Sequence, residues 1–213
     1  MLFQRATEKA EKVEPLKSSR EVMEIMYRLL IFMKNEEING DVLEIGVKKG
    51  KTTVFLAEIL KELYPESKLI TFDPFTDEGA KQSLKKEANQ IKKIQKTFEF
   101  HTQKLKNHLH FNRSSEDFPL LLPDCGLMLT FIDGEHTFDA VMRDFDNVFN
   151  ETVNGGVIAI DDYQNSAWPG VPRAYRKIRQ IYKNYIELNY CTPKTVFLRK
   201  IKHVSRSGIQ KTD

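Results

Sequence analysis

An alternation of strand-like and helix-like segments is the feature that most constrains how this 213-residue chain can fold. Short apolar runs typical of buried strands alternate with longer stretches whose apolar residues recur at helical spacing. This order predicts a doubly wound α/β domain with a mostly parallel seven-stranded sheet, helices on both faces and an antiparallel C-terminal hairpin. The predicted strands are 41–47, 68–73, 108–112, 127–133, 157–161, 185–190 and 195–198. The predicted helices are 22–33, 51–64, 77–98, 138–149 and 171–182.

The chain length suits one domain of this kind with short appendages. We expect a helical extension over residues 1–38, the sheet domain over 39–200 and a basic tail over 201–213. With 40% apolar and 30% charged residues, the composition is that of a soluble globular protein. No segment approaches the roughly 18 apolar residues of a membrane-spanning helix. The N-terminal residues show no secretory signal, and the two cysteines have no disulfide or metal spacing, so we expect a cytoplasmic protein.

The distribution of charge is more informative than the net charge of +3, which does not by itself indicate a nucleic-acid binder. Between residues 131 and 162 there are eight acidic residues and one basic residue, Arg143. The segment 81–96 contains six lysines and one glutamate. We expect the lysine-rich segment to be the solvated face of an amphipathic helix lying over the edge of the domain, with attraction of an anionic acceptor as the alternative. The acidic segment points to a functional site.

A glycine-containing turn follows the first predicted strand. Residues 44–50, with the sequence EIGVKKG, end the strand and lead directly into a helix. Lys48 stands where the dinucleotide-binding fingerprint needs glycine. The E-x-G-x-x-x-G spacing instead resembles motif I of class I S-adenosylmethionine-dependent methyltransferases, which implies a cofactor site that includes Glu44, Gly46 and Gly50.

Two further positions fit a nucleoside cofactor. Asp73 ends the second predicted strand, where a carboxylate can accept hydrogen bonds from both ribose hydroxyls. Ser114 and Ser115 follow the third strand and are candidates for the adenine side. An equally good interpretation is that Ser115 is the N-cap of a helix that opens at residues 116–117.

Carboxylates follow the fourth and fifth predicted strands. Asp133 ends one strand, and Asp161 and Asp162 end the other. If the two strands are neighbours, their ends lie about 5 Å apart. Carboxylates so close together either raise one another's pKa or need a cation. Oxygen ligands favour Mg²⁺, with Mn²⁺ or Ca²⁺ as alternatives, over zinc.

The stretch 131–163, FIDGEHTFDAVMRDFDNVFNETVNGGVIAIDDY, and the PGVPRAYRKI of residues 169–178 make the resemblance more specific. They resemble the macrocin O-methyltransferase-like and cephalosporin-hydroxylase-like group of class I methyltransferases. With motif I and Asp73, the resemblance covers roughly residues 41–181. It implies a class I methyltransferase fold with S-adenosylmethionine as cofactor. It also implies that Asp133, Asp161 and Asp162 bind Mg²⁺ and that Glu135 is the general base; Asp133 is also expected beside the cofactor.

The role of His136, three residues after Asp133, stays open. It is either a hydrogen-bonded structural group or a catalytic residue that acts as acid or base or orients a ligand carboxylate. Trp168 and Tyr163 either form a wall of the pocket or pack the loop, with stacking against an acceptor as the alternative.

These observations predict methyl transfer to a hydroxyl of a small molecule or sugar, with a vicinal diol or catechol as the most suitable acceptor. A nucleic-acid methyltransferase is an alternative, but the acidic edge would repel phosphates and the motif for exocyclic amines is missing. A non-catalytic cofactor- or metal-binding module of a larger assembly is a second alternative. A hydroxylase is a third, for which the sequence offers no iron-binding triad. Exposed apolar positions on helix 22–33 would allow a homodimer.

Overall fold

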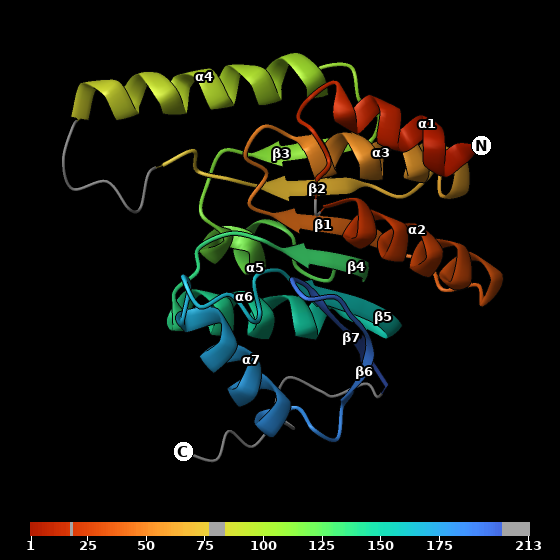
Figure 1. Ribbon diagram of the computed structural model, residues 1–213. Coiled ribbons are helices and arrows are strands. Elements are labelled where there is room, and N and C mark those ends of the chain that lie inside the picture. Colours follow the sequence, from red (N-terminus) through yellow and green to blue (C-terminus); the bar gives the residue numbers. More distant parts are fainter. Residues whose placement is uncertain (18, 77–83, 202–213) are drawn as a thin grey trace.

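The computed structural model describes residues 1–17, 19–76 and 84–201, and within them the chain forms a seven-stranded sheet (Figure 1). The strand order is β3-β2-β1-β4-β5-β7-β6. Strands β1 to β5 run parallel, and β7 is antiparallel to both β5 and β6. This confirms the predicted fold. The strands are β1 (Asp41–Ile45), β2 (Leu69–Phe72), β3 (His108–Phe111), β4 (Leu127–Ile132), β5 (Thr152–Ile160), β6 (Ile186–Cys191) and β7 (Val196–Lys200).

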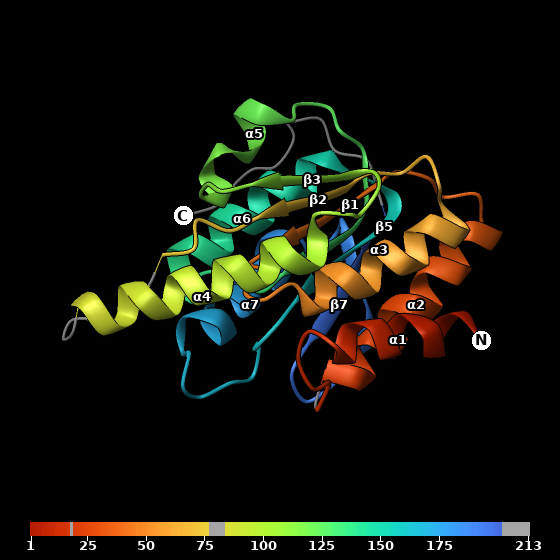
Figure 2. The same ribbon diagram turned by 90° about the horizontal axis from the view of Figure 1, so that it is seen from above.

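Helices cover both faces of the sheet because successive strand residues point to opposite sides. In β1, Val42 packs into one core and Leu43 into the other. Figure 2 shows α1, α2 and α3 across the sheet from α5 and α6. The helices are α1 (Leu2–Glu11), α2 (Ser19–Asn35), α3 (Lys51–Leu63), α4 (Leu84–Thr102), α5 (Phe118–Leu121), α6 (Phe138–Glu151) and α7 (Gly170–Ile181), with a 3₁₀ turn, η1 (Ser115–Asp117).

Helix α4 lies over the edge strand β3, as predicted (Figure 1). Phe98 attaches it, with its ring 4.5 Å from the ring of His110. The described lysines of this helix, Lys92, Lys93 and Lys96, are exposed, which agrees with a solvated face. The part of the predicted helix over 77–83 lies outside the described residues, as does the predicted tail beyond residue 201.

Three sequence expectations differ from the structure. Helix α1 was not predicted. Strand β5 begins at Thr152, which pairs with Leu127, five residues before the predicted start at residue 157. The apolar residues of α2 on which a homodimer surface was based are largely buried within the chain; Met26 and Met33 are 0% exposed.

The strand topology indicates which edge of the sheet is suited to bind a ligand. The carboxyl ends of the parallel strands meet at one edge of the sheet, and the chain changes winding direction between β1 and β4, where open α/β sheets bind ligands. Among the described residues, no helix has the length and apolar character needed to cross a membrane.

Candidate functional site

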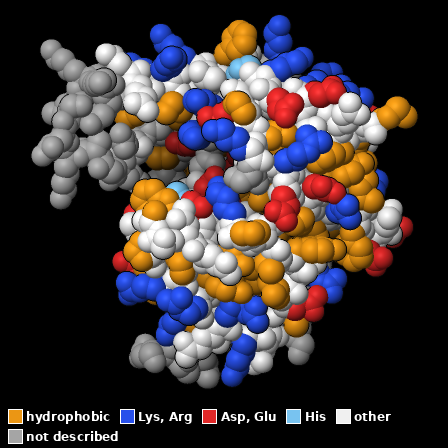
Figure 3. Space-filling model, viewed as in Figure 1, with side chains coloured by type: hydrophobic (Ala, Val, Ile, Leu, Met, Phe, Trp, Pro, Cys, Tyr) orange, Lys and Arg blue, Asp and Glu red, His pale blue; other side chains and the backbone are white. Residues whose placement is uncertain are grey.

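A cavity of about 700 Å³ opens at the carboxyl ends of β1, β2, β4 and β5. Figure 3 shows side chains of both charges around the hollow. The extension 1–38 forms part of its wall through Glu14, Ser19 and the inner face of α2. Of the residues predicted to bind the cofactor or metal or to act in catalysis, all except Gly50 line this cavity, namely Glu44, Gly46, Asp73, Ser115, Asp133, Glu135, His136, Asp161 and Asp162.

The turn after β1 depends on its two glycines. Gly46 has φ 84° and Gly50 has φ 88°, values that side chains disfavour. A Cβ on Gly46 would overlap the backbone carbonyl of Asp133, and a Cβ on Gly50 would come within 2.9 Å of the Phe98 ring. The glycines therefore let the turn lie directly against β4 and α4, beneath the cavity.

Asp73 stabilises this turn through hydrogen bonds to its backbone. One carboxylate oxygen accepts hydrogen bonds from the backbone N–H groups of Val47 and Lys48, at 2.9 and 3.0 Å. The other accepts from the N–H of Phe75 at 2.7 Å. A carboxylate has about four acceptor positions, so capacity is left for the predicted contact with ribose hydroxyls.

Glu44 lies below the turn and is 1% exposed. Its carboxyl accepts a hydrogen bond of 2.6 Å from the buried hydroxyl of Thr53. Burial raises the pKa of Glu44 well above its ordinary value, and the charges of Asp133 and Asp73 act in the same direction. The structure thus ties this predicted cofactor residue into the fold at a position that also lines the cavity.

The two serines after β3 have separate tasks. Ser114, not Ser115, is the N-cap of η1, because its hydroxyl accepts from the N–H of Glu116. Ser115 donates a 2.6 Å hydrogen bond to the buried carboxyl of Asp144 on α6. Burial raises the pKa of Asp144 to about 6. Both serines line the cavity on the side expected for adenine.

Strands β4 and β5 are neighbours, with Ile132 paired to Ile160, so the predicted aspartates meet at the sheet edge. Ligand atoms of Asp133, His136 and Asp162 all lie within 4.8 Å of one another. The Nε2 of His136 is 3.3 Å from Asp162 Oδ2 and 3.7 Å from Asp133 Oδ1. It is buried, and no described residue satisfies it with a hydrogen bond. This cluster has the size and the donor atoms to hold a divalent cation.

Nearby charges shift the pKa of His136, and Asp162 has an unusual backbone conformation. The Asp133 carboxylate raises the pKa of His136, with Asp162 and Asp161 adding to the effect and burial opposing it. Asp162 has φ 55°, a conformation that few residues other than glycine and asparagine or aspartate adopt. Asp162 consequently faces His136 and also lies 3.8 Å from Lys194, the partner of Asp161.

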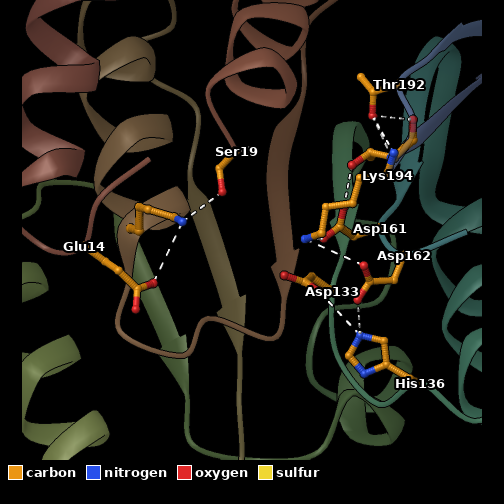
Figure 4. Close-up of polar contacts among 10 residues, drawn as sticks. Glu14, Ser19, Asp133, His136, Asp161, Asp162, Thr192 and Lys194 are labelled. Atoms are coloured by element: carbon orange, nitrogen blue, oxygen red, sulfur yellow. Dashed lines mark hydrogen bonds and ion pairs between the residues drawn. The ribbon is translucent and has the colours of Figure 1, made fainter. Parts of the chain in front are cut away.

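Asp161 is 3% exposed and is held from the other side. One oxygen accepts from Lys194 Nζ and the other from Thr195 Oγ1, both in the turn between β6 and β7 (Figure 4). Burial, followed by the charge of Asp133, raises the pKa of Asp161 to about 6. The structure therefore places His136 beside Asp133 and Asp162, and Lys194 against Asp161. Lys194 was missed because nothing in the local sequence links it to residues 33 positions earlier.

The remaining predicted residues surround this cluster. Glu135 lines the cavity and accepts a 2.7 Å hydrogen bond from Thr137, the N-cap residue of α6. Trp168 is 47% exposed and stacks on His136, with 4.7 Å between the ring centroids. Tyr163 is 6% exposed and packs against Tyr175, and it is not among the residues that line the cavity. Of these two predicted aromatic residues, only Trp168 lines the cavity.

Comparison with known proteins agrees with this geometry. A family model described as a methyltransferase domain matches residues 43–163. The uncharacterized protein R132 of Acanthamoeba polyphaga mimivirus is 32% identical over 138 residues, which are 63% of this chain and 57% of the viral protein. The match thus spans little more than half of that relative.

Two solved structures share the fold. The O-methyltransferase NovP is 16% identical with a TM-score of 0.68, over 86% of this chain and 81% of that one. The MycE methyltransferase of the mycinamycin biosynthetic pathway, solved with Mg and SAH, is 16% identical with a TM-score of 0.55, over 89% of this chain and 52% of that one. The family match over residues 43–163, on a sheet of this topology, leads to one conclusion: the chain belongs to the methyltransferase-domain family and has the class I methyltransferase fold.

Proposed function

We propose that the chain transfers the methyl group of S-adenosylmethionine to a hydroxyl oxygen of a small molecule or sugar, with the assistance of a divalent cation. The observation that carries this proposal is the cluster of Asp133, His136 and Asp162, whose ligand atoms lie within 4.8 Å of one another in the wall of the cavity. Relatives of the same fold include an O-methyltransferase and an enzyme solved with Mg and SAH, which supports both parts of the proposal.

The chain would hold the cofactor along the motif I turn. The backbone at Gly46 and Gly50 permits close approach, Asp73 accepts from the ribose hydroxyls, and the adenine lies towards Ser115. S-adenosylmethionine supplies a methyl group that its sulfonium already activates, and a divalent cation lowers the pKa of an acceptor hydroxyl. The protein's own contribution is therefore to align the acceptor and to remove its proton.

Asp133, Asp162 and His136 would hold the cation, which we expect to be Mg²⁺, Mn²⁺ or Ca²⁺. Glu135, two residues from Asp133 and also at the cavity, would take the proton from the acceptor hydroxyl. Its present partner is the hydroxyl of Thr137, a neutral group that leaves the carboxylate able to accept a second hydrogen bond.

The cavity favours an acceptor that is flat or that carries two adjacent hydroxyls. Two adjacent oxygens can chelate one cation, which orients the acceptor as well as activating it. Trp168, half-exposed beside His136, offers a flat surface to an aromatic ring or to the apolar face of a sugar. We therefore propose vicinal diols and catechols as the first acceptors to test.

The experiment is calorimetric titration of the full chain with S-adenosylmethionine and with Mg²⁺ or Mn²⁺, followed by methyl transfer to a panel of diols. Asp162→Asn should weaken metal binding by about 10- to 100-fold and leave the affinity for S-adenosylmethionine within about threefold. Asp124→Asn is the matched control, because Asp124 has a similar φ of 58° and is exposed. Asparagine tolerates this conformation, so neither variant strains the backbone. Undiminished turnover by Asp162→Asn after removal of metal would contradict the proposal.

A further inference from the structure

The positively charged ammonium group of Lys194 lies beside the proposed metal site. Its Nζ pairs with Asp161 Oδ2 and lies 3.8 Å from Asp162 Oδ1. Figure 4 shows the side chain reaching from the β6–β7 turn towards both aspartates. The residue lines the cavity, and 39% of its side chain is exposed. No sequence motif assigned it a role.

The turn that carries Lys194 is held firmly in place. The Thr192 hydroxyl accepts the N–H groups of Lys194 and Thr195, at 3.1 and 2.8 Å. The N–H of Thr192 donates to the carbonyl of Thr195 at 2.8 Å. The N–H of Tyr163, directly after the aspartate pair, donates to the Lys194 carbonyl at 3.2 Å. The backbone of Lys194 is therefore fixed next to the aspartates, and its pair with Asp161 holds the ammonium group there.

Both oxygens of Asp161 are used by this turn. Thr195 donates to Oδ1, and Lys194 pairs with Oδ2. Asp162, turned by its φ of 55°, faces His136 instead. A divalent cation that bound Asp161 would lie close to the ammonium group, and the two positive charges would repel each other.

We propose that Lys194 is a positioning residue that withholds Asp161 from the metal, so that a divalent cation meets Asp133, His136 and Asp162. This inference rests on the proposed metal-assisted function. It has a chemical consequence, because the ligand set is then one imidazole nitrogen and two carboxylates rather than three carboxylates. Imidazole binds transition metals better than it binds Mg²⁺ or Ca²⁺, so Lys194 sets a preference for Mn²⁺ over Mg²⁺.

The test measures metal binding without turnover. The affinities of the full chain for Mn²⁺ and Mg²⁺ are determined by calorimetry, with electron paramagnetic resonance of free Mn²⁺ as a second readout. The wild type should bind Mn²⁺ at least about tenfold more tightly than Mg²⁺. Lys194→Met keeps the length of the side chain and removes its charge. It should bind Mg²⁺ about tenfold more tightly than the wild type and show a smaller Mn²⁺ preference.

Two further variants identify the cause. Lys183→Met removes the charge of an exposed lysine beyond α7 and should behave like the wild type. The double variant Lys194→Met with Asp161→Asn should lose the gain in Mg²⁺ affinity, since the gain comes from Asp161. Binding of S-adenosylhomocysteine reports that each variant is folded. Affinities in Lys194→Met within about twofold of the wild type would overturn the inference.

The outcomes separate this inference from the proposed function. If the wild type binds neither metal and Lys194→Met binds both, Lys194 opposes metal binding at Asp161, but the inferred ligand set and the metal-assisted function are both wrong for the natural chain. If neither protein binds metal while both bind S-adenosylhomocysteine, both proposals are wrong. If Asp161→Asn alone weakens Mn²⁺ binding as strongly as Asp162→Asn does, Asp161 is a ligand and the inference is overturned.

Discussion

Gly46 holds together the two halves of the site. Its φ is 84°, and its N–H donates to the carbonyl of Phe72 at 2.8 Å. On the other side, the N–H of Asp133 donates to the carbonyl of Ile45 at 2.8 Å, which draws the end of β4 against the turn. A Cβ at Gly46 would overlap the Asp133 carbonyl. The first proposed metal ligand and the cofactor turn are adjacent because this position has no side chain.

Gly46→Ala should therefore cost about 2–4 kcal/mol of unfolding free energy, since it adds a steric overlap to an unfavourable φ. It should also weaken binding of S-adenosylhomocysteine by at least about tenfold, because the turn must move. Urea unfolding and calorimetry measure the two effects.

Gly126→Ala is the control for the backbone conformation alone. Gly126 has φ 48°, and a Cβ there would lie 3.7 Å from the Val153 side chain, an ordinary contact. It should cost only about 1–2 kcal/mol and leave cofactor binding unchanged. Equal losses in the two variants would show that the ends of β1 and β4 separate without penalty.

At the scale of elements, α4 and β3 enclose two histidines. Both imidazoles lie 2.9 Å from the hydroxyl of Thr71 on β2. The rings of Phe98 and Phe75 cover His110, and Asp73 and Glu99 oppose the effect of its burial. Burial, and then the nearby His110, lower the pKa of His108 to about 4. The surroundings at this edge of the sheet thus favour the neutral form of both imidazoles.

The direction of the resulting pH dependence follows from the lowered pKa. Unfolding returns the pKa of His108 to about 6.5, so the unfolded chain binds more protons and the native state loses stability as pH falls from 6.5 towards 4. Between pH 7 and pH 5 the loss attributable to His108 should be about 2 kcal/mol.

His108→Gln should reduce this pH dependence of the unfolding free energy, measured by urea titration at both pH values. His101→Gln on α4 is the control and should retain the wild-type dependence. If His108→Gln loses as much stability on acidification as the wild type, other groups cause the acid sensitivity of this edge.

Elements were predictable where they bury large apolar side chains. The prediction for α3, with Phe55, Leu56 and Ile59 on one face and a glycine before it, agrees with the structure almost to the residue. Helix α1 was missed because its buried face consists of Ala6, Thr7 and Ala10. Small residues let a helix pack closely, but they do not produce a strong hydrophobic period. Acidic partners then fix α1, as in the 2.5 Å contact of Lys9 with Glu58.

At the scale of the whole molecule, the site was predictable where parallel strands end together. The order of helices and strands placed Asp133 beside residues 161–162, because both follow parallel strands. Lys194 could not be found in this way. It lies at the aspartates only because β7 pairs antiparallel with β5, with Val196 opposite Ile160, which brings the hairpin turn to the carboxyl edge. The sequence predicted the β6–β7 hairpin but not that β7 pairs with β5.

The assembled cavity has opposite charges on its two sides. Lys49 and Lys51 lie near Glu14, and Lys51 also donates to Ser19 at 2.8 Å. Figure 4 shows Glu14 and Ser19 on one side and the aspartates on the other, and all of them line the cavity. The acidic side is where the proposed mechanism places the methyl group. A positively charged methyl donor and a divalent cation would therefore share one group of carboxylates.

This arrangement predicts a link between metal and the charge of the cofactor. S-adenosylmethionine carries a sulfonium charge that S-adenosylhomocysteine lacks, so without metal the aspartates should favour the methyl donor. Saturating Mn²⁺ should reduce that preference by about three- to tenfold, because it neutralises the carboxylates. Calorimetry of both compounds, in EDTA and in Mn²⁺ without acceptor, measures the ratio of affinities. Asp133→Asn should imitate the metal by lowering the ratio in EDTA. A ratio that neither Mn²⁺ nor this variant changes would place the sulfonium away from the acidic side and would require a different orientation of the cofactor.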